Sequence, residues 1–256
     1  MKDFLESLGK KVEDALLTAG RIGIIFGQVC HLAFTPPFKL RNIFRQMEFV
    51  GVNSLFIVLL TGSFTGMVLA MQSYIALNKF GAESLVGTTV ALSMTRELGP
   101  VLTGLMVTGR AGSAMATELG TMRVSEQIDA LYTMAINPVK YLIVPRVIAG
   151  VLMLPILVIV ADLVGIAGGY LIGVNMLDIN SGVYMARTEE YLQMSDIFNG
   201  LIKAAVFGLL ISLSACYQGF NAKGGAEGVG KCTTQAVVMG SVMVLISDFL
   251  LTTFMF

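Results

Sequence analysis

The sequence predicts an all-α polytopic membrane protein, in which an N-terminal interfacial amphipathic helix precedes five transmembrane helices. Hydrophobic residues make up 55% of the 256 positions and charged residues only 13%, whereas a soluble domain carries about 25% charged residues. The mean hydropathy is +0.78. Five apolar segments are each long enough to cross a bilayer, which takes about 20 residues.

The first predicted region is cytoplasmic or interfacial and comprises residues 1–45. Within it, the segment 16–34 is apolar but interrupted by Arg21, Gln28 and His31. A spanning helix tolerates few such residues, so we expect an amphipathic helix in the plane of the interface, with a true span as the alternative. Pro36 and Pro37 should end this helix, because proline cannot continue one.

Residues 46–256 are predicted to form a five-helix transmembrane domain. The first span is expected within the uncharged residues 49–78, and the others over 84–115, 147–177, 197–220 and 236–256. Gly99-Pro100 should kink or break the second span. The motif Gly62-x-x-x-Gly66 in the first span indicates close helix packing, and packing within the chain is the simplest interpretation.

The distribution of basic residues predicts the orientation of the spans. Lysine and arginine are concentrated in the N-terminal region and in the second and fourth loops. The first and third loops carry only Lys79 and Arg187, with Lys203 at the margin of a span. The positive-inside rule therefore predicts a cytoplasmic N-terminus and places Phe256 outside.

Two adjacent charges, Arg96 and Glu97, lie near the middle of the second predicted span. An unpaired charge at the centre of a bilayer costs about 3 kcal/mol on insertion scales. Adjacent positions on a helix point in different directions, so these two side chains cannot simply neutralise each other. Two interpretations remain open: the charges line a water-filled cavity, or they form structural ion pairs with Asp162 or Asp248.

The loop after the second span is predicted to contain a cytoplasmic amphipathic helix at about residues 118–140. Its charged positions are Glu118, Arg123, Glu126, Asp129 and Lys140. Its apolar positions recur with helical spacing and should share one face: Val124, Ile128, Leu131 and Ala135. Such a helix could lie on the membrane, but its acidic exposed face would be repelled by anionic lipid, which favours docking to a partner protein.

Several function classes lack support in the sequence. The formal net charge is zero and no basic stripe is present, which argues against nucleic acid as a partner. The cysteines Cys30, Cys216 and Cys232 lack metal-ligand spacing, and one histidine, His31, supplies no second ligand, so we expect free thiols and no metal. No nucleophile–base arrangement or carboxylate pair indicates catalytic residues.

A near match to a phosphate-binding loop occurs at residues 225–232, GAEGVGKC. The match fails because Cys232 cannot supply the hydroxyl that holds Mg²⁺, and because the flanking segments are membrane helices rather than a strand and its helix. We therefore expect no nucleotide site in this chain, so any energy from ATP must come from a partner.

The stretch RELGPVLTGLMVTGRAGSAMATELGTMRVSEQIDALYTMAINPVKYLIVPR, residues 96–146, resembles the signature of the MlaE/YrbE-type permeases. These are the membrane subunits of Mla (maintenance of lipid asymmetry) phospholipid ABC transporters. The likeness also includes GMVLAMQ in the first span and the closing SDFLLTTFMF, and it covers essentially the whole chain.

The resemblance implies a multi-pass protein of the Gram-negative inner membrane, with a periplasmic C-terminus. The chain would be a non-catalytic homodimer without a cofactor, bound to two cytoplasmic ABC ATPase subunits that bind ATP. A hexameric periplasmic MCE-domain lipid-binding protein and a small STAS-domain subunit would complete the assembly. The cargo would be phospholipid, moved between the inner membrane and a periplasmic carrier path to the outer membrane to maintain its lipid asymmetry.

The resemblance also implies roles for particular residues. The lipid-binding cavity would be lined by Arg96, Glu97, Leu98, Leu69, Leu77 and Phe80. The ATPase-coupling helix would be centred on Glu126, Gln127, Asp129 and Leu131. Lys203 and Asp248 match charged positions of the family, whereas the resemblance assigns no role to Asp162.

Three other functions compete with this interpretation. A secondary transporter or channel for a small solute would use the buried charges of Arg96 and Glu97. Such proteins typically show paired repeats, whereas this sequence shows five spans and no clear repeat. A membrane-bound lipid enzyme and a passive scaffold are the other two alternatives.

Overall fold

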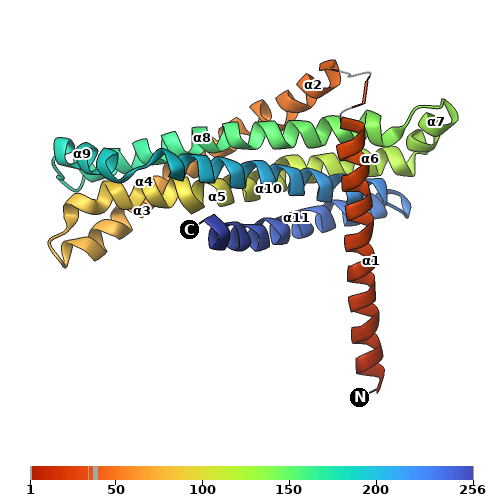
Figure 1. Ribbon diagram of the computed structural model, residues 1–256, viewed down its shortest axis with the longest axis horizontal. Helices are drawn as coiled ribbons and strands as arrows, with labels where there is room; N and C mark the ends of the chain where they lie inside the picture. Colours follow the sequence, from red (N-terminus) through yellow and green to blue (C-terminus); the bar gives the residue numbers. More distant parts are fainter. Residues whose placement is uncertain (1, 34, 37–39, 256) are drawn as a thin grey trace.

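The computed structural model describes residues 2–33, 35–36 and 40–255, and within these ranges every regular element is a helix. Most of the long helices run roughly along one axis and form an elongated bundle (Figure 1). Helix α1 (Lys2–Ala33) crosses one end of this bundle and projects away from it, roughly perpendicular to the long axis. The N-terminal helix is therefore separate from the bundle along most of its length.

The bundle is built around four long apolar helices and one interrupted helix. Helix α2 (Leu40–Val50) leads through the short turn η1 (Val52–Ser54) into α3 (Leu55–Asn78). The remaining long helices are α8 (Val144–Asn175), α10 (Met194–Phe220) and α11 (Gly225–Met255). Hydrophobic residues along these helices supply the core, with Val58, Leu154, Phe207 and Val244 almost fully buried.

The second predicted span is a chain of short helices. In order, its elements are η2 (Glu83–Leu85), α4 (Val86–Ser93), η3 (Met94–Leu98), α5 (Gly99–Val107), η4 (Thr108–Gly112) and α6 (Ser113–Val124). The elements η3 and η4 are π-helical turns. The run packs between α8, α10 and α11.

The predicted interruption at Gly99-Pro100 is confirmed, and it takes the form of the π turn η3. Pro100 has no N–H to donate to the carbonyl of Arg96, four residues earlier, and its ring would clash with that carbonyl. Instead, the N–H of Gly99 donates to the carbonyl of Met94, five residues back. The wider turn leaves the Arg96 carbonyl available to another group.

Five of the described helical segments are long and apolar enough to cross a membrane: Leu16–Ala33, Leu40–Asn78, Val139–Asn175, Met194–Phe220 and Gly225–Met255. The number equals the number predicted, but the set differs. The run of η2 through α6 is not among them, and it carries Arg96, Glu97 and Arg110 within its apolar sequence. Conversely, the segment Leu16–Ala33, predicted to be interfacial, qualifies by length and composition.

Small residues let α3 and α8 pack with their backbones in close contact. A Cβ on Gly62 would lie 2.9 Å from the carbonyl oxygen of Ala161, and a Cβ on Gly66 would collide with the backbone of Gly165. The glycines of the first span therefore pack within the chain, as predicted. Gly208 of α10 meets Gly150 of α8 in the same way.

The last predicted span is longer than expected. Helix α11 begins at Gly225, not at residue 236, so residues 225–232 form its first turns rather than a phosphate-binding loop. The buried Cys232 packs against Gly120 of α6. Tertiary contact therefore outweighs the low helix propensity of the glycine-rich segment.

Short helices cover the two ends of the bundle. After α6 comes α7 (Gln127–Thr133), followed by the π turn η5 (Val139–Ile143), which leads into α8. At the opposite end, α9 (Ser181–Tyr191) packs against α4, held by the buried Tyr184 (Figure 1). A Cβ on Gly173 or Gly87 would collide with the ring of Tyr184, so these glycines make room for it.

Candidate functional site

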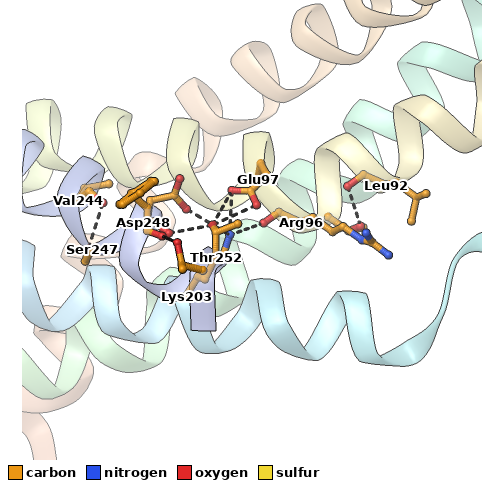
Figure 2. A network of polar contacts seen from close by, with 11 residues as sticks. Leu92, Arg96, Glu97, Lys203, Val244, Ser247, Asp248 and Thr252 are labelled. Atoms are coloured by element: carbon orange, nitrogen blue, oxygen red, sulfur yellow. Dashed lines mark hydrogen bonds and ion pairs between the residues drawn. The ribbon is translucent and has the colours of Figure 1, made fainter. Parts of the chain in front are cut away.

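A polar network centred on Lys203 lies within the apolar bundle (Figure 2). The side chain of Lys203 is fully buried. Its Nζ donates to Glu97 Oε2 at 2.8 Å, to Thr252 Oγ1 at 2.7 Å and to the carbonyl oxygen of Arg96 at 2.9 Å. The network thus joins η3, α10 and α11.

The geometry around Lys203 follows from the break at Pro100. Because Pro100 cannot donate to the Arg96 carbonyl, that oxygen is available to the ammonium group. An ammonium group has three N–H donors, and each of them finds an acceptor here. Asp248 Oδ1 lies 3.3 Å from Nζ as an ion pair but forms no hydrogen bond with the described residues. Asp248 therefore contributes mainly charge.

Arg96 points away from Lys203 and pairs with Asp196 of α10. Its Nη2 lies 2.8 Å and its Nε 2.9 Å from Asp196 Oδ1. The other carboxylate oxygen of Asp196 accepts from the backbone N–H of Gln193, which completes a capping box at the start of α10. The carboxylate of Asp196 is 3% exposed, while the side chain of Arg96 retains 38% exposure.

Arg96 and Glu97 form structural ion pairs and also keep part of their side chains exposed. Each side chain has an ionic partner, yet each remains 38% exposed. Among the described residues, Asp248 pairs with Lys203, whereas Arg96 pairs with Asp196, so the predicted pairing with Asp248 is not found. The predicted pairing with Asp162 is wrong: its Oδ1 is buried against Gly99 and has no hydrogen-bond partner in the described part of the chain.

An apolar groove of about 390 Å³ lies beside the network. Leu98, the residue after Glu97, lines it together with Leu69 of α3. The other lining residues are Phe64, Thr65, Val68 and Gln72. A charged network next to an apolar groove suits an amphiphile, because each part of such a molecule would find a matching surface.

The other predicted cavity residues occupy different surroundings. Leu77 packs against the buried cluster around Val90 and Tyr184, and Leu69 and Leu98 also contact this cluster. Phe80 is 84% exposed in the turn after α3. The structure therefore brings Leu69 and Leu98 together at the groove, packs the partly buried Leu77 against the same cluster and leaves Phe80 at the surface.

The predicted coupling segment forms a short helix instead of one long helix. Glu126 adopts a left-handed backbone conformation with φ 59°, which separates α6 from α7, and Ala135, with φ 56°, follows α7. The prediction of a continuous helix over residues 118–140 is therefore wrong. L-residues avoid this region, so tertiary constraints must hold these two breaks.

The surface of α7 carries most of the predicted coupling residues. Ile128 is fully buried and Leu131 half-buried, so they anchor the helix. Glu126, Gln127 and Asp129 are exposed, and Asp129 Oδ1 lies 2.6 Å from Arg123 Nη1. Val124 and Ala135, predicted to share the buried face, are exposed because the breaks move them out of register.

The contacts of Lys203 and Arg96 include two residues that the sequence patterns did not single out, Asp196 and Thr252. Two signals could have found them. Asp196 lies three residues after Gln193 at a predicted helix start, the spacing of a capping box. Thr252 lies four residues after Asp248, so both side chains project from one face of their helix.

A bundle of apolar helices with a partly accessible charge network at a broken central helix is typical of a membrane transport protein. The chain matches the family model described as Permease MlaE over residues 43–254 and belongs to this family. It is therefore a multi-pass membrane protein of the ABC transporter permease class, as the sequence resemblance predicted.

The chain is similar to several named relatives over most of its length. It is 41% identical to the intermembrane phospholipid transport system permease protein MlaE of Haemophilus influenzae, covering 99% of this chain and 98% of the relative. It is 48% identical to a probable ABC transporter permease protein of Rickettsia conorii, over 98% and 96%. It is also 41% identical to the chloroplastic protein trigalactosyldiacylglycerol 1 of Arabidopsis thaliana, over 92% and 67%.

Proposed function

We propose that this chain is the permease subunit of an ABC transporter that moves phospholipids between the inner membrane and a periplasmic carrier path to the outer membrane. Its role would be to maintain the lipid asymmetry of the outer membrane. The observation that carries the proposal is the apolar groove at Leu69 and Leu98, since Leu98 directly follows the paired charges Arg96 and Glu97 in η3. Family membership and the name of the Haemophilus relative support it.

The proposed assembly is a homodimer bound to two cytoplasmic ATPase subunits, which bind the ATP. A hexameric MCE-domain protein on the periplasmic side and a small STAS-domain subunit belong to the same proposal. The exposed apolar residues of α3 and α11, among them Phe56, Phe64, Val242 and Phe249, supply surfaces that lipid or a second copy would cover. This chain is proposed to need no cofactor of its own.

In the proposed orientation the N-terminus and α7 lie on the cytoplasmic side, and α9 and the C-terminus on the periplasmic side. Helix α1 crosses the bundle at the α7 end (Figure 1), which suits a helix in the plane of the cytoplasmic interface. The five spans are then α2 with α3, the run from α4 to α6, η5 with α8, α10 and α11. Few residues of Leu16–Ala33 are buried within the bundle, which fits contact with lipid headgroups and acyl chains.

The proposed mechanism transmits ATPase closure through α7. Helix α7 connects α6 directly to η5 and α8, and α6 continues through η4 and α5 into η3, which carries Arg96 and Glu97. A push on α7 would therefore change the groove at η3. Arg96 would attract the phosphodiester of a lipid, while the acyl chains would occupy the groove beside Leu98.

Substitution of Arg96 tests the proposal. Arg96→Glu would place a second carboxylate beside Asp196 and remove the cation proposed to attract the phosphodiester, so outer-membrane barrier function should fall while the complex still assembles. Detergent sensitivity of cells and co-purification of the subunits measure the two effects. Arg187→Glu is the control, because Arg187 lies on the exposed surface of α9. Unaltered detergent sensitivity of Arg96→Glu would contradict a lipid role for this residue.

A secondary transporter or channel for a small solute is the second candidate. The observation that favours it is the excess of carboxylates, since Glu97, Asp248 and Asp196 accompany only Lys203 and Arg96. Solute flux through the isolated chain in liposomes without ATP would support that candidate and contradict the ABC permease proposal.

A further inference from the structure

Two cavities adjoin where α2, α6 and η5 meet, away from the groove at Leu98. The first is polar, with a volume of about 190 Å³, and its polar lining residues are Asn42, Arg45, Gln46, Glu118, Tyr141 and Arg146. The second is mostly apolar, with a volume of about 340 Å³, and its lining includes Leu32, Ile43, Ile136, Val144 and Ile148. Among the described residues that line it, Lys140 is the one charged residue, and its Nζ donates to the carbonyl of Pro36. Tyr141 and Pro145 line both cavities, which are therefore neighbours.

Arg146 supplies the polar cavity with a buried guanidinium group. Its side chain is 3% exposed. One guanidinium nitrogen, Nη1, donates to the carbonyl of Leu142 at 2.7 Å, and Nη2 lies 2.7 Å from Glu118 Oε2. The third nitrogen, Nε, is buried and has no hydrogen-bond partner among the described residues. A buried donor without an acceptor costs free energy, so an acceptor in this cavity would stabilise the protein.

The cavity also has an excess of positive charge. Arg45 and Arg146 contribute two guanidinium groups, whereas Glu118 contributes one carboxylate. Gln46 Oε1 is buried and lacks a hydrogen-bond partner in the described ranges. Rotation of that amide would present its N–H donors instead. Guanidinium groups bind phosphate with two parallel hydrogen bonds, so the cavity matches a phosphate-bearing anion.

Residues of helix α2 line both cavities. Asn42, Arg45 and Gln46 line the polar cavity, while Ile43 lines the apolar one. A free phosphate ion would use only the first cavity. A phospholipid would use both, because its headgroup and an acyl chain would each find a matching volume.

We infer that this pair of cavities binds one anionic glycerophospholipid, with its phosphodiester at Arg45 and Arg146 and an acyl chain in the apolar cavity. Basic pockets between membrane helices on the cytoplasmic side bind anionic headgroups. The assignment to the cytoplasmic leaflet rests on the proposed orientation. The bound lipid is distinct from transported cargo, because no lining residue is shared with the groove at Leu98.

Lipid binding to the purified full-length permease tests this inference. The protein in detergent is incubated with equal amounts of phosphatidylglycerol and phosphatidylcholine that carry the same acyl chains, and bound lipid is measured by native mass spectrometry. The wild type should retain phosphatidylglycerol preferentially. Arg45→Gln should weaken this binding roughly tenfold, the usual effect of losing one charge-assisted hydrogen bond. Arg41→Gln is the matched control, because Arg41 is exposed on the same helix but does not line the cavity.

Two further variants keep the test decisive. Glu118→Gln together with Arg146→Gln removes both charges of the buried pair at once, and it should abolish the lipid preference even if Arg146→Gln alone unfolds. Ala33→Phe should fill part of the apolar cavity and weaken binding without a change in charge. If Arg41→Gln and Arg45→Gln lose phosphatidylglycerol binding equally, the lipid binds to a general basic surface, and the inference is overturned.

A soluble competitor separates a lipid from a free phosphate ligand. Glycerol 3-phosphate at millimolar concentration should not displace phosphatidylglycerol, because it has no acyl chain for the apolar cavity. Efficient displacement would overturn the assignment to lipid. The measurement requires no transport, so its failure is distinguishable from a failure of the proposed permease function.

Discussion

Lys203 is the residue on which the polar network depends. It is fully buried, and its ammonium group lies between the carboxylates of Glu97 and Asp248. A lysine inside a bilayer is costly unless it is paired, so the network explains why the residue is tolerated there. It also fixes the position of Glu97 relative to α10 and α11.

Replacing Lys203 with methionine should destabilise the protein strongly. Lys203→Met would leave Glu97 and Asp248 near each other without a cation, and breaking a buried pair costs about 3 kcal/mol or more. The measurement is the thermal unfolding temperature of the purified protein in detergent. Combining Lys203→Met with Glu97→Gln should recover part of the loss, because one of the two carboxylates becomes neutral. Equal stability of the wild type and Lys203→Met would contradict a structural role for the network.

The pairings of single residues were only partly predictable. The sequence indicated that Arg96, Glu97, Lys203 and Asp248 are charges in apolar surroundings, because each interrupts a hydrophobic segment. It could not assign Arg96 to Asp196 or exclude Asp162. Those outcomes depend on how η3 is rotated against α10, and hydropathy along one segment carries no information on that rotation.

At the scale of single elements, Pro100 produces the π turn η3, and this turn sets the geometry of the site. Pro100 prevents the usual helical hydrogen bond to Arg96, and the freed carbonyl accepts from Lys203. The extra residue in the π turn rotates the preceding helix, α4, relative to α5. The direction of Arg96 and Glu97 is therefore set by Pro100.

Pro100→Ala should disturb function, and it should also lower stability because it weakens the contacts of the buried Lys203. Alanine supplies the missing N–H, so the segment could return to regular α-helical bonding and the Arg96 carbonyl would no longer be available to Lys203. Arg96 and Glu97 would turn away from Asp196 and Lys203. Cells carrying this variant should become detergent-sensitive while the protein still accumulates in the membrane. Normal detergent resistance would contradict the role assigned to the turn.

A second prediction at the scale of single elements concerns the contact between α3 and α8. Gly66→Ala should destabilise the protein by about 1–3 kcal/mol, the usual cost of overpacking, because the added methyl group would collide with the backbone of Gly165. Thermal unfolding in detergent measures the loss. Gly109→Ala is the control, since a Cβ at Gly109 meets no atom within 4 Å. Comparable losses of stability in Gly66→Ala and Gly109→Ala would show that the loss is not caused by packing of α3 against α8.

At the scale of the whole molecule, the elements that face the two ends of the bundle differ in character. The α7 end carries the short helix with exposed Glu126 and Asp129, and α1 crosses it (Figure 1). The opposite end carries α9, fixed to the bundle by the buried Tyr184. Motion of α7 would therefore reach η3 through the continuous run from α6 to α5.

Charge reversal on α7 tests the proposed contact with the ATPase. Glu126→Lys and Asp129→Lys should each abolish co-purification of the ATPase subunit, because like charges would face each other across the contact. Glu126→Gly is the matched control for backbone effects, since glycine readily adopts the left-handed conformation found at this position. Normal ATPase binding by both lysine variants would refute the assignment of α7 as the coupling helix.

The sequence by itself determined the class of the protein, most of its apolar helices, the break at Gly99-Pro100 and the presence of charges within the membrane domain. These features follow from hydropathy, proline chemistry and small-residue spacing, which act within a single segment. Only the tertiary structure decided the partners of Arg96 and Lys203, the isolation of Asp162, the short length of α7 and the early start of α11. Each of these depends on contacts between segments far apart in the chain, where packing outweighs local propensity.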